Sequence, residues 1–362
     1  MSSDPARFGS GDPGGRGRSR VLIVDDSSTI RRLLRDRLSA DPRLEVVGEA
    51  ADPIEARAMI KALSPDVLTL DVEMPTMNGL DFLEKLMRLR PMPVVMISTE
   101  THRGSASAIE ALALGAVDCV GKPNSTGLPG ETVDLADIVV QAARARVRPG
   151  GASPRITPPA DFSWGGKIVL IGSSTGGVEA IETVLSGFPA NCPPTLIAQH
   201  MPEAFLASFA ERLAARMRPK VRLARDGEPL AQGHVFLAPG GDVHLEVRTS
   251  VSPECRLSRG EKRNGHRPSV DVLFGSAVPL AERTVAVILT GMGRDGAQEL
   301  ATLRAAGART IAQDAATSVV YGMPRAALDL GGVESELPLH DIGRRILALA
   351  SQHPMPAGRT AS

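Results

Sequence analysis

The sequence predicts a two-domain α/β protein. Three observations predict this. First, the chain has 362 residues, which is too many for one ordinary hydrophobic core. Short apolar runs alternate with segments of helical periodicity in both halves, which is typical of parallel sheets covered by helices. A stretch rich in Pro, Gly and Ser, RPGGASPRITPPADFSWGG at residues 148–166, separates the halves. We expect an N-terminal doubly wound five-stranded parallel sheet, then a C-terminal α/β domain with a mainly parallel sheet and a small antiparallel insertion.

Composition excludes several classes of protein. Lys+Arg and Asp+Glu number 41 each, so nothing predicts general attraction to nucleic acid or to an anionic membrane. The cysteines Cys119, Cys192 and Cys255 lack CxxC spacing, which argues against a disulfide framework or a structural zinc site. Residues 1–19 contain no apolar stretch of the kind that a signal peptide requires. We therefore expect a cytoplasmic protein.

The first half contains five strand-like runs. In chain order they are VLIVDD, LEVVGEA, DVLTLDVE, PVVMISTE and VDCVGKP, within residues 21–123. The residues between them have helical periodicity. Asp52, Pro53 and Glu55 open one of these helices as cap, first-turn proline and capping-box acid. Strands separated by helices predict a parallel sheet.

The second half shows the same alternation of strand-like runs and helical segments. KIVLI, PTLIAQ, TVAVILT and RTIAQ indicate buried strands, and residues 203–216 and 270–280 indicate helices. Between residues 221 and 257 short alternating pieces broken by Pro and Gly predict the antiparallel insertion. The expected bounds are a disordered tail at 1–19, domains at 20–141 and 166–350, a linker at 142–165, and a second disordered tail at 351–362.

Acidic residues gather at one edge of the first predicted sheet. Asp25 and Asp26 end the first strand and Asp71 ends the third. Three carboxylates together favour a divalent ion such as Mg²⁺. Ser98 and Lys122 end the fourth and fifth strands, where a hydroxyl and an ammonium could hold a phosphoryl group on Asp71. The alternative is that the aspartates only cap helices, which five matching positions in order make less favourable.

Ser174 lies in a GxSxG turn between a strand and a helix, GSSTGG at residues 172–177. Such a turn exposes the hydroxyl at a helix N-terminus, where backbone N–H groups could stabilise an oxyanion. The same strand-turn-helix pattern could also bind phosphate without covalent chemistry. The turn alone does not separate these two interpretations.

His200 favours the first interpretation because it directly follows the strand PTLIAQ and should reach the same sheet edge as Ser174. Asp295 follows TVAVILT and could orient this histidine. Asp271 and Asp314 are alternative acids, although Asp271 falls at a predicted helix start. The sequence therefore predicts a Ser-His-Asp triad of nucleophile, base and acid.

The motifs of the first half resemble the receiver domain of two-component response regulators, a flavodoxin-like fold. The matching stretches are VLIVDD, DVEMPTMNGLDFL, VVMIST and GAVDCVGKP, covering about residues 20–141. The resemblance implies that Asp71 is phosphorylated, that Asp25 and Asp26 help to bind Mg²⁺, that Ser98 is the switch hydroxyl and that Lys122 contacts the phosphoryl group. A histidine kinase would be the phosphodonor.

The second half resembles the catalytic domain of the chemotaxis protein-glutamate methylesterase (CheB) family. The matching stretches are IGSSTGGVEAI, AQHMPEAF, LAPGGDVHL, RPSVDVLFGSA, ILTGMGRDGA and QDAATSVVYGMPRAA. The resemblance implies the triad above, with Thr175 and Met292 lining the oxyanion site. Ser173 and Arg294 depart from the family, which more often has alanine and asparagine there.

Together the resemblances imply a phosphorylation-activated serine hydrolase. It would demethylate glutamate methyl esters on chemoreceptors, and deamidate glutamines there, without a cofactor for hydrolysis. Mg²⁺ would be needed for receiver phosphorylation. The rivals are a receiver-controlled binding protein without hydrolytic activity and a transcriptional regulator, although no helix-turn-helix pattern supports the latter. We also expect the unphosphorylated receiver to cover the edge that bears Ser174.

Overall fold

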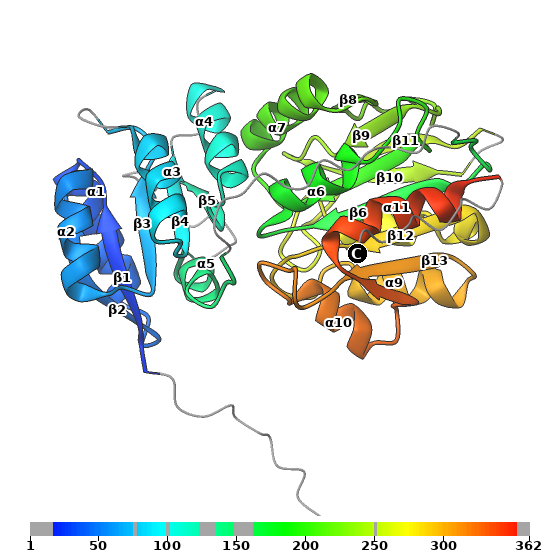
Figure 1. Ribbon diagram of the computed structural model, residues 1–362. Coiled ribbons are helices and arrows are strands. Elements are labelled where there is room, and N and C mark those ends of the chain that lie inside the picture. Colours follow the sequence, from blue (N-terminus) through cyan, green and yellow to red (C-terminus); the bar gives the residue numbers. More distant parts are fainter. Residues whose placement is uncertain are drawn as a thin grey trace, which may run out of the picture.

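The computed structural model describes residues 17–74, 78–98, 102–122, 135–147, 162–249 and 252–352. They form two α/β domains that lie side by side, the first coloured blue to cyan and the second green to red (Figure 1). Each domain has its own parallel sheet with helices on both faces. The predicted fold class is confirmed.

The first domain is built on one five-stranded parallel sheet in the order β2-β1-β3-β4-β5. Its strands are β1 (Ser19–Val24), β2 (Leu44–Ala50), β3 (Val67–Asp71), β4 (Val94–Ser98) and β5 (Asp118–Gly121). Its helices are α1 (Ser28–Ser39), α2 (Pro53–Leu63), α3 (Gly79–Leu89), α4 (His102–Ala113) and α5 (Leu135–Ala142). The chain runs from β1 to β2 on one side and to β3, β4 and β5 on the other.

Local sequence explains where α2 begins. The Asp52 carboxylate accepts hydrogen bonds from the N–H groups of Ile54 and Glu55, at 2.7 and 2.9 Å. The Glu55 carboxylate accepts one from the Ala51 N–H at 2.7 Å. These bonds satisfy N–H groups that a helix start leaves without partners, as the capping pattern predicted.

The second domain contains a seven-stranded parallel sheet in the order β14-β13-β12-β6-β7-β9-β8. Its strands are β6 (Ile168–Ser173), β7 (Thr195–Gln199), β8 (Lys220–Leu223), β9 (His234–Leu237), β12 (Thr284–Ile288), β13 (Arg309–Gln313) and β14 (Ser335–Leu337). The helical elements are α6 (Gly177–Ser186), α7 (Glu203–Arg216), α8 (Val270–Ser276), η1 (Val278–Arg283), α9 (Ala297–Ala305), α10 (Met323–Asp329) and α11 (Leu339–Ala350). The expected helix at residues 203–216 is confirmed as α7.

The antiparallel insertion is smaller than the sequence predicted. Among the strands that the structure describes, β10 (Val243–Arg248) and β11 (Glu254–Arg259) form an antiparallel pair, whereas β8 and β9 extend the main sheet in parallel. Val235, Phe236 and Leu237 of β9 are fully buried. A continuous apolar run of this kind suits a strand that is covered on both faces of a parallel sheet, not an alternating hairpin.

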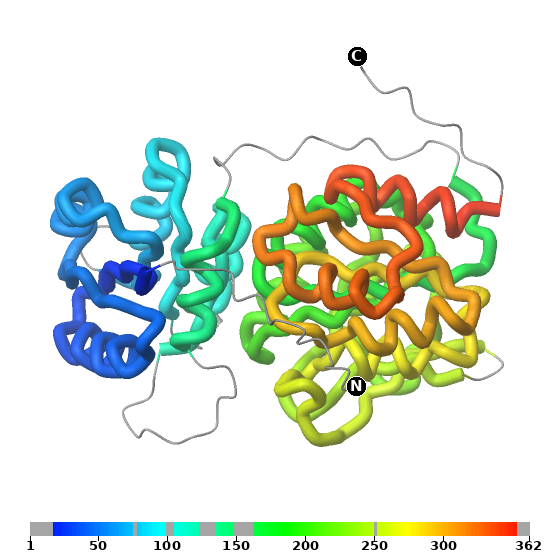
Figure 2. The backbone as a smooth tube through the Cα atoms, turned by 90° about the horizontal axis from the view of Figure 1, so that it is seen from below, coloured from blue at the N-terminus to red at the C-terminus, as the bar shows by residue number. Residues whose placement is uncertain are grey.

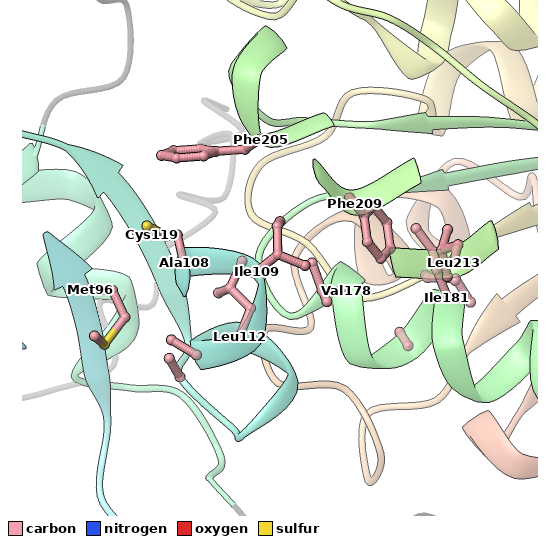
Figure 3. Packing of buried hydrophobic residues seen from close by; sticks show 14 of the residues in the cluster. Met96, Ala108, Ile109, Leu112, Cys119, Val178, Ile181, Phe205, Phe209 and Leu213 are labelled. Carbon is pink, nitrogen blue, oxygen red and sulfur yellow. The ribbon is translucent and has the colours of Figure 1, made fainter. Parts of the chain in front are cut away.

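The two domains pack through an apolar contact. α4 of the first domain lies against α6 and α7 of the second, and Figure 3 shows Ile109 and Leu112 of α4 extending toward Val178 and Phe209. Ile109 is 1% exposed. The turned view in Figure 2 shows the same two domains side by side. Apolar side chains of both domains therefore belong to one buried cluster.

The expected linker at 142–165 is described only at its ends. Arg146 donates from its backbone N–H to the Val319 carbonyl at 3.2 Å, and from its side chain to the Ala315 carbonyl at 3.1 Å. Phe162 is buried in the second domain, and Trp164 pairs with Ser351. Most of the two expected tails lies outside the described residues. Within the described part of the chain, no helix is both long and apolar enough to cross a membrane.

Candidate active site and acidic pocket

Ser174 lies between the end of β6 and the start of α6. Its N–H donates to the Thr290 carbonyl at 3.0 Å, and its carbonyl accepts from the Gly177 N–H at 2.8 Å. Gly176 has a φ of +78°, and a Cβ there would approach Val319 to 2.7 Å. The turn therefore requires glycine at this point, and it presents Ser174 at the carboxyl edge of the sheet.

Gln199, the last residue of β7, joins the serine turn to the histidine. Its side-chain oxygen accepts from the Ser173 hydroxyl at 2.6 Å. Its amide nitrogen donates to the carbonyls of Ser174 and His200, at 2.9 and 3.1 Å. Sequence reasoning did not single out Gln199. These bonds also give a structural use to Ser173, which departs from the family pattern.

The Asp295 carboxylate is buried and holds the histidine. Its Oδ2 lies 2.8 Å from Nε2 of His200. The same carboxylate accepts from Asn264 at 2.9 Å, from the Ser269 hydroxyl at 2.8 Å and from the Val270 N–H at 2.6 Å. Burial alone would raise the pKa of Asp295, but the hydrogen bonds from His200, Asn264 and Val270 hold that pKa below its usual range. Asp295 is therefore ionised at neutral pH.

The two alternative acids have other partners. Asp271 accepts from Asn264 and from the Glu299 N–H, and Asp314 accepts from the Thr317 N–H and hydroxyl. Among the residues that the structure describes, Asp295 is the carboxylate that hydrogen-bonds His200.

The hydrogen bond to Asp295 decides which histidine nitrogen can act as a base. An ionised carboxylate only accepts hydrogen bonds, so Nε2 of His200 must carry the proton. Nδ1 of His200 then carries the free lone pair. This atom is buried and has no hydrogen-bond partner among the described residues. In the neutral imidazole, Nδ1 is therefore the atom that can accept a proton.

Thr175 and Met292 lie beside the serine. The Thr175 hydroxyl donates to the Asp118 carboxylate of the first domain at 2.6 Å. Met292, which is half-buried, follows Gly291, where a Cβ would approach the Ser174 Cβ to 2.8 Å. The loop after β12 therefore packs closely on the serine turn.

The predicted acidic pocket is present in the first domain. Oxygens of Asp25, Asp26 and Asp71 lie within 4.8 Å of one another. Lys122 Nζ lies 2.8 Å from Asp71 and 3.7 Å from Asp25, and Ser98 is buried at the end of β4. One Asp25 oxygen is buried and has no hydrogen-bond partner within the described part of the chain. Burial, with the Asp71 charge second, raises the pKa of Asp25 to about 6. These residues fit a divalent cation, which would relieve the crowded negative charge.

The sequence therefore located residues that the fold brings together at two separate sites. It missed Gln199, Asn264, His266 and Ser269, which surround the triad. The only signal for any of them is the Asn264-Gly265 dipeptide, which favours a tight hairpin turn.

The fold and the two sites define a response regulator whose output domain has the side-chain arrangement of a serine hydrolase. Family models match the chain as "Response regulator receiver domain" over residues 21–128 and as "CheB methylesterase" over residues 169–346. The chain belongs to the CheB methylesterase family, as its motifs predicted.

Curated relatives are similar over nearly the whole chain. A protein-glutamate methylesterase/protein-glutamine glutaminase 1 of Caulobacter vibrioides is 57% identical over 337 residues, covering 92% of this chain and 98% of the relative. The corresponding protein of Agrobacterium fabrum is 56% identical over 344 residues, covering 92% and 97%. The solved CheB methylesterase catalytic domain of Thermotoga maritima is 38% identical, covers 51% of this chain and 98% of its own, and gives a TM-score of 0.49.

Proposed function

We propose that this chain hydrolyses glutamate methyl esters on chemoreceptors and deamidates glutamine side chains there, which gives sensory adaptation in bacterial chemotaxis. The observation that carries the proposal is the 2.8 Å contact between His200 Nε2 and Asp295, beside β6, the strand that Ser174 directly follows. Ser174 would be the nucleophile, His200 the base and Asp295 the orienting acid. The names and high identity of the relatives support this activity.

In the proposed reaction Ser174 Oγ attacks the ester carbonyl while Nδ1 of His200 takes the hydroxyl proton. The imidazolium gives that proton to the methoxy oxygen, which leaves as methanol. Water then attacks the acyl-enzyme and loses a proton to Nδ1. Ser174 Oγ leaves with this proton, which releases the glutamate carboxyl. With a glutamine side chain, ammonia is the first leaving group.

Groups of this chain would stabilise both charges that develop in the reaction, the positive charge on the His200 imidazolium and the negative charge on the substrate oxygen. Asp295 remains ionised and stabilises the imidazolium. The N-terminus of α6 begins at Gly177, three residues after Ser174, and favours negative charge on a substrate oxygen. Thr175 and Met292 are the residues that we propose to line this oxyanion site. The hydrolysis itself would need no cofactor, because these groups supply nucleophile, base and charge stabilisation.

The first domain would control this activity through phosphorylation of Asp71 by a chemotaxis histidine kinase. Asp25, Asp26 and Asp71 would hold Mg²⁺, which neutralises phosphoryl charge when bound. Lys122 already contacts Asp71 and would contact a phosphoryl oxygen. Ser98, at the end of the neighbouring strand, would be the switch hydroxyl.

The packing of the domains supports autoinhibition. Asp118 of the receiver accepts a hydrogen bond from Thr175, the residue after the serine. A cavity of about 270 Å³ at this junction is lined by Ser174 and by the receiver residues 112–118. The unphosphorylated receiver would therefore cover the approach to Ser174, and a receptor helix would reach this serine only when the domains separate.

Phosphorylation would stabilise the separated form. A modification shifts such an equilibrium only by the difference in its stabilisation of the two forms. A coupling of about 1 to 3 kcal/mol corresponds to roughly 5- to 150-fold activation. Phosphoryl-Asp71 would act through Ser98 and Lys122 on the face that α4 presents to the second domain.

The proposed organisation keeps the receiver at residues 20–141, the linker at 142–165 and the methylesterase domain at 166–350, with tails at 1–19 and 351–362. Methylated chemoreceptors would be both substrate and binding partner. The chain would bind no nucleic acid and would not insert into a membrane. The proposed place of action is the cytoplasm, where the receptor helices that carry the esters lie.

The deciding experiment measures methanol release from methylated chemoreceptor by the full-length chain and by Ser174→Ala. We expect turnover by the first, increased by a small phosphodonor, and none by the second. Equal methanol release by the two proteins would refute the assignment of the serine. No release by either, with the chain folded and phosphorylated, would favour a binding protein instead.

A further inference from the structure

A tight hairpin lies behind the triad, in the loop after β11. Arg263 and His266 exchange both backbone hydrogen bonds, at 3.1 and 3.0 Å. Asn264 and Gly265 between them have φ values of +52° and +82°. Two positive φ angles in a two-residue turn are the reason that Asn-Gly is favoured there. The hairpin therefore fixes the side chains of Asn264 and His266 relative to each other.

This hairpin contacts two members of the triad at once. The Asn264 amide donates to Asp295 at 2.9 Å and to Asp271 at 2.6 Å. The ring of His266 stacks on the ring of His200, with centroids 3.6 Å apart and planes inclined by 6°. One segment of chain thus holds both the acid and the base.

The hydrogen bond that His200 donates to Asp295 does not by itself fix the His200 ring. It holds one atom, Nε2, and leaves the ring able to tilt about that contact, because the χ2 torsion of histidine has a broad minimum. A tilt changes the direction of Nδ1, which is the nitrogen left to exchange protons with Ser174. A flat neighbour in van der Waals contact with the ring removes this freedom.

We propose that His266 is a positioning residue, whose flat ring fixes the plane of His200 and so the direction of Nδ1, the nitrogen that the proposed reaction uses, before and after proton transfer. The inference rests on the proposed hydrolase function and adds a residue to it. His266 itself transfers no proton in this role.

The charge state of His266 suits the role. Burial lowers the pKa of His266 to about 3, with the neighbouring His200 as the second cause. The ring is therefore neutral at neutral pH, and its π face is compatible with the cation that His200 becomes when it takes a proton. A second charged ring at 3.6 Å would repel that cation. The role requires a flat, neutral side chain, so phenylalanine should replace histidine and leucine should not.

The experiment compares full-length wild type with His266→Phe and His266→Leu. The matched control is His234→Leu on β9, because His234 also stacks on an aromatic ring, that of Phe236, but does not contact the triad. We expect His266→Leu to lower kcat for the methyl ester by about 10- to 100-fold with KM changed by less than about 3-fold. His266→Phe should stay within about 5-fold of wild type, and His234→Leu should be unchanged.

A second measurement follows the stack without using activity. In histidine-labelled protein, the ring current of His266 should displace the NMR resonance of the His200 ring protons, which a His200→Gln sample assigns. The displacement should persist in His266→Phe and disappear in His266→Leu. Dispersed resonances of the other histidines verify that each variant is folded.

The outcomes separate the inference from the function on which it rests. If His266→Phe is as slow as His266→Leu while its stack persists, the ring nitrogens matter and the positioning role is wrong. Wild-type kcat in His266→Leu would overturn it as well. A wild-type chain without ester turnover would overturn the proposed hydrolase and the role of His266 in it, while the resonance would still report the stack.

Discussion

Replacing Ile109 by alanine should raise the basal ester turnover of the unphosphorylated protein. Ile109 is 1% exposed and extends from α4 of the receiver toward α6 of the catalytic domain (Figure 3). Alanine is the best helix former, so α4 itself should persist. The substitution therefore weakens the contact between the domains more than it weakens the helix.

The size of the effect follows from the atoms removed. Alanine lacks three of the isoleucine carbons, each worth about 0.8 kcal/mol when buried, or about 2.4 kcal/mol together. Part of this burial belongs to the receiver itself, so about 1 to 2 kcal/mol is lost from the closed form. At about 1.4 kcal/mol per tenfold change, the open fraction and the basal rate rise by roughly 5- to 30-fold.

The assay is methanol release from methylated receptor, with and without a small phosphodonor. Ile109→Ala should respond less to phosphodonor than wild type, because both changes populate the same open form. Ile54→Ala is the matched control, since Ile54 is an isoleucine of the same domain that is 78% exposed on α2. Phosphate uptake by Asp71 verifies that the receiver is folded. Unchanged basal turnover in a folded Ile109→Ala protein, or an equal rise in Ile54→Ala, would refute the reasoning.

Four further outcomes follow from the two sites. Ser174→Ala and His200→Ala should each lower methanol release by at least about 1,000-fold without unfolding the chain, because nucleophile and base act as one unit. Asp295→Asn should lower kcat by about 10²- to 10⁴-fold. The pKa of Asp295 is lower in the folded chain than its ordinary value of 3.8. Its ionised form therefore stabilises the fold above pH 3.8, and this stabilisation is lost as the pH falls toward the folded-state pKa. Thermal melts at graded pH should show less acid sensitivity in Asp295→Asn. Asp71→Asn should abolish the response to phosphodonor while keeping basal turnover, and continued response would reassign the phosphoacceptor. Mg²⁺ should raise the melting temperature of wild type but not of Asp25→Asn, and chelation should stop activation by phosphodonor without changing basal turnover.

The strand ends of this protein were predictable because buried parallel strands leave a clear mark on the sequence. The runs ending near Asp71, Ser174 and His200 are mostly apolar and are buried over their whole length, and a parallel sheet brings such ends to one edge. The structure brings oxygens of Asp25, Asp26 and Asp71 within 4.8 Å of one another, and His200 within 2.8 Å of Asp295. The same reasoning failed for β9, because its flanking Pro and Gly residues resembled hairpin turns.

The support around the triad could not be predicted in the same way. His266 reaches His200 through a hairpin whose position depends on the packing of β11 and α8, and no spacing rule connects the two histidines. The interdomain contact of Ile109 could not be predicted either. A helix that packs only on its own sheet and a helix that also packs on another domain both show apolar residues at helical spacing. Contacts between elements distant in sequence carry this information.

Both candidate sites lie at the point where the strand order of their sheet reverses, because the chain adds strands first on one side and then on the other. Open α/β sheets form a crevice for ligands at this point. In the receiver, β1 and β3 are neighbours, and Asp25 and Asp71 come from their ends. In the second domain, β6 is the central strand, with β7 on one side and β12 on the other. Ser174 follows β6, so the chain order Ser, His, Asp becomes His, Ser, Asp across the sheet. The Asp295 carboxylate must therefore reach His200 past the strand of the nucleophile. That reach explains why so many donors, from Asn264 to Val270, hold this carboxylate.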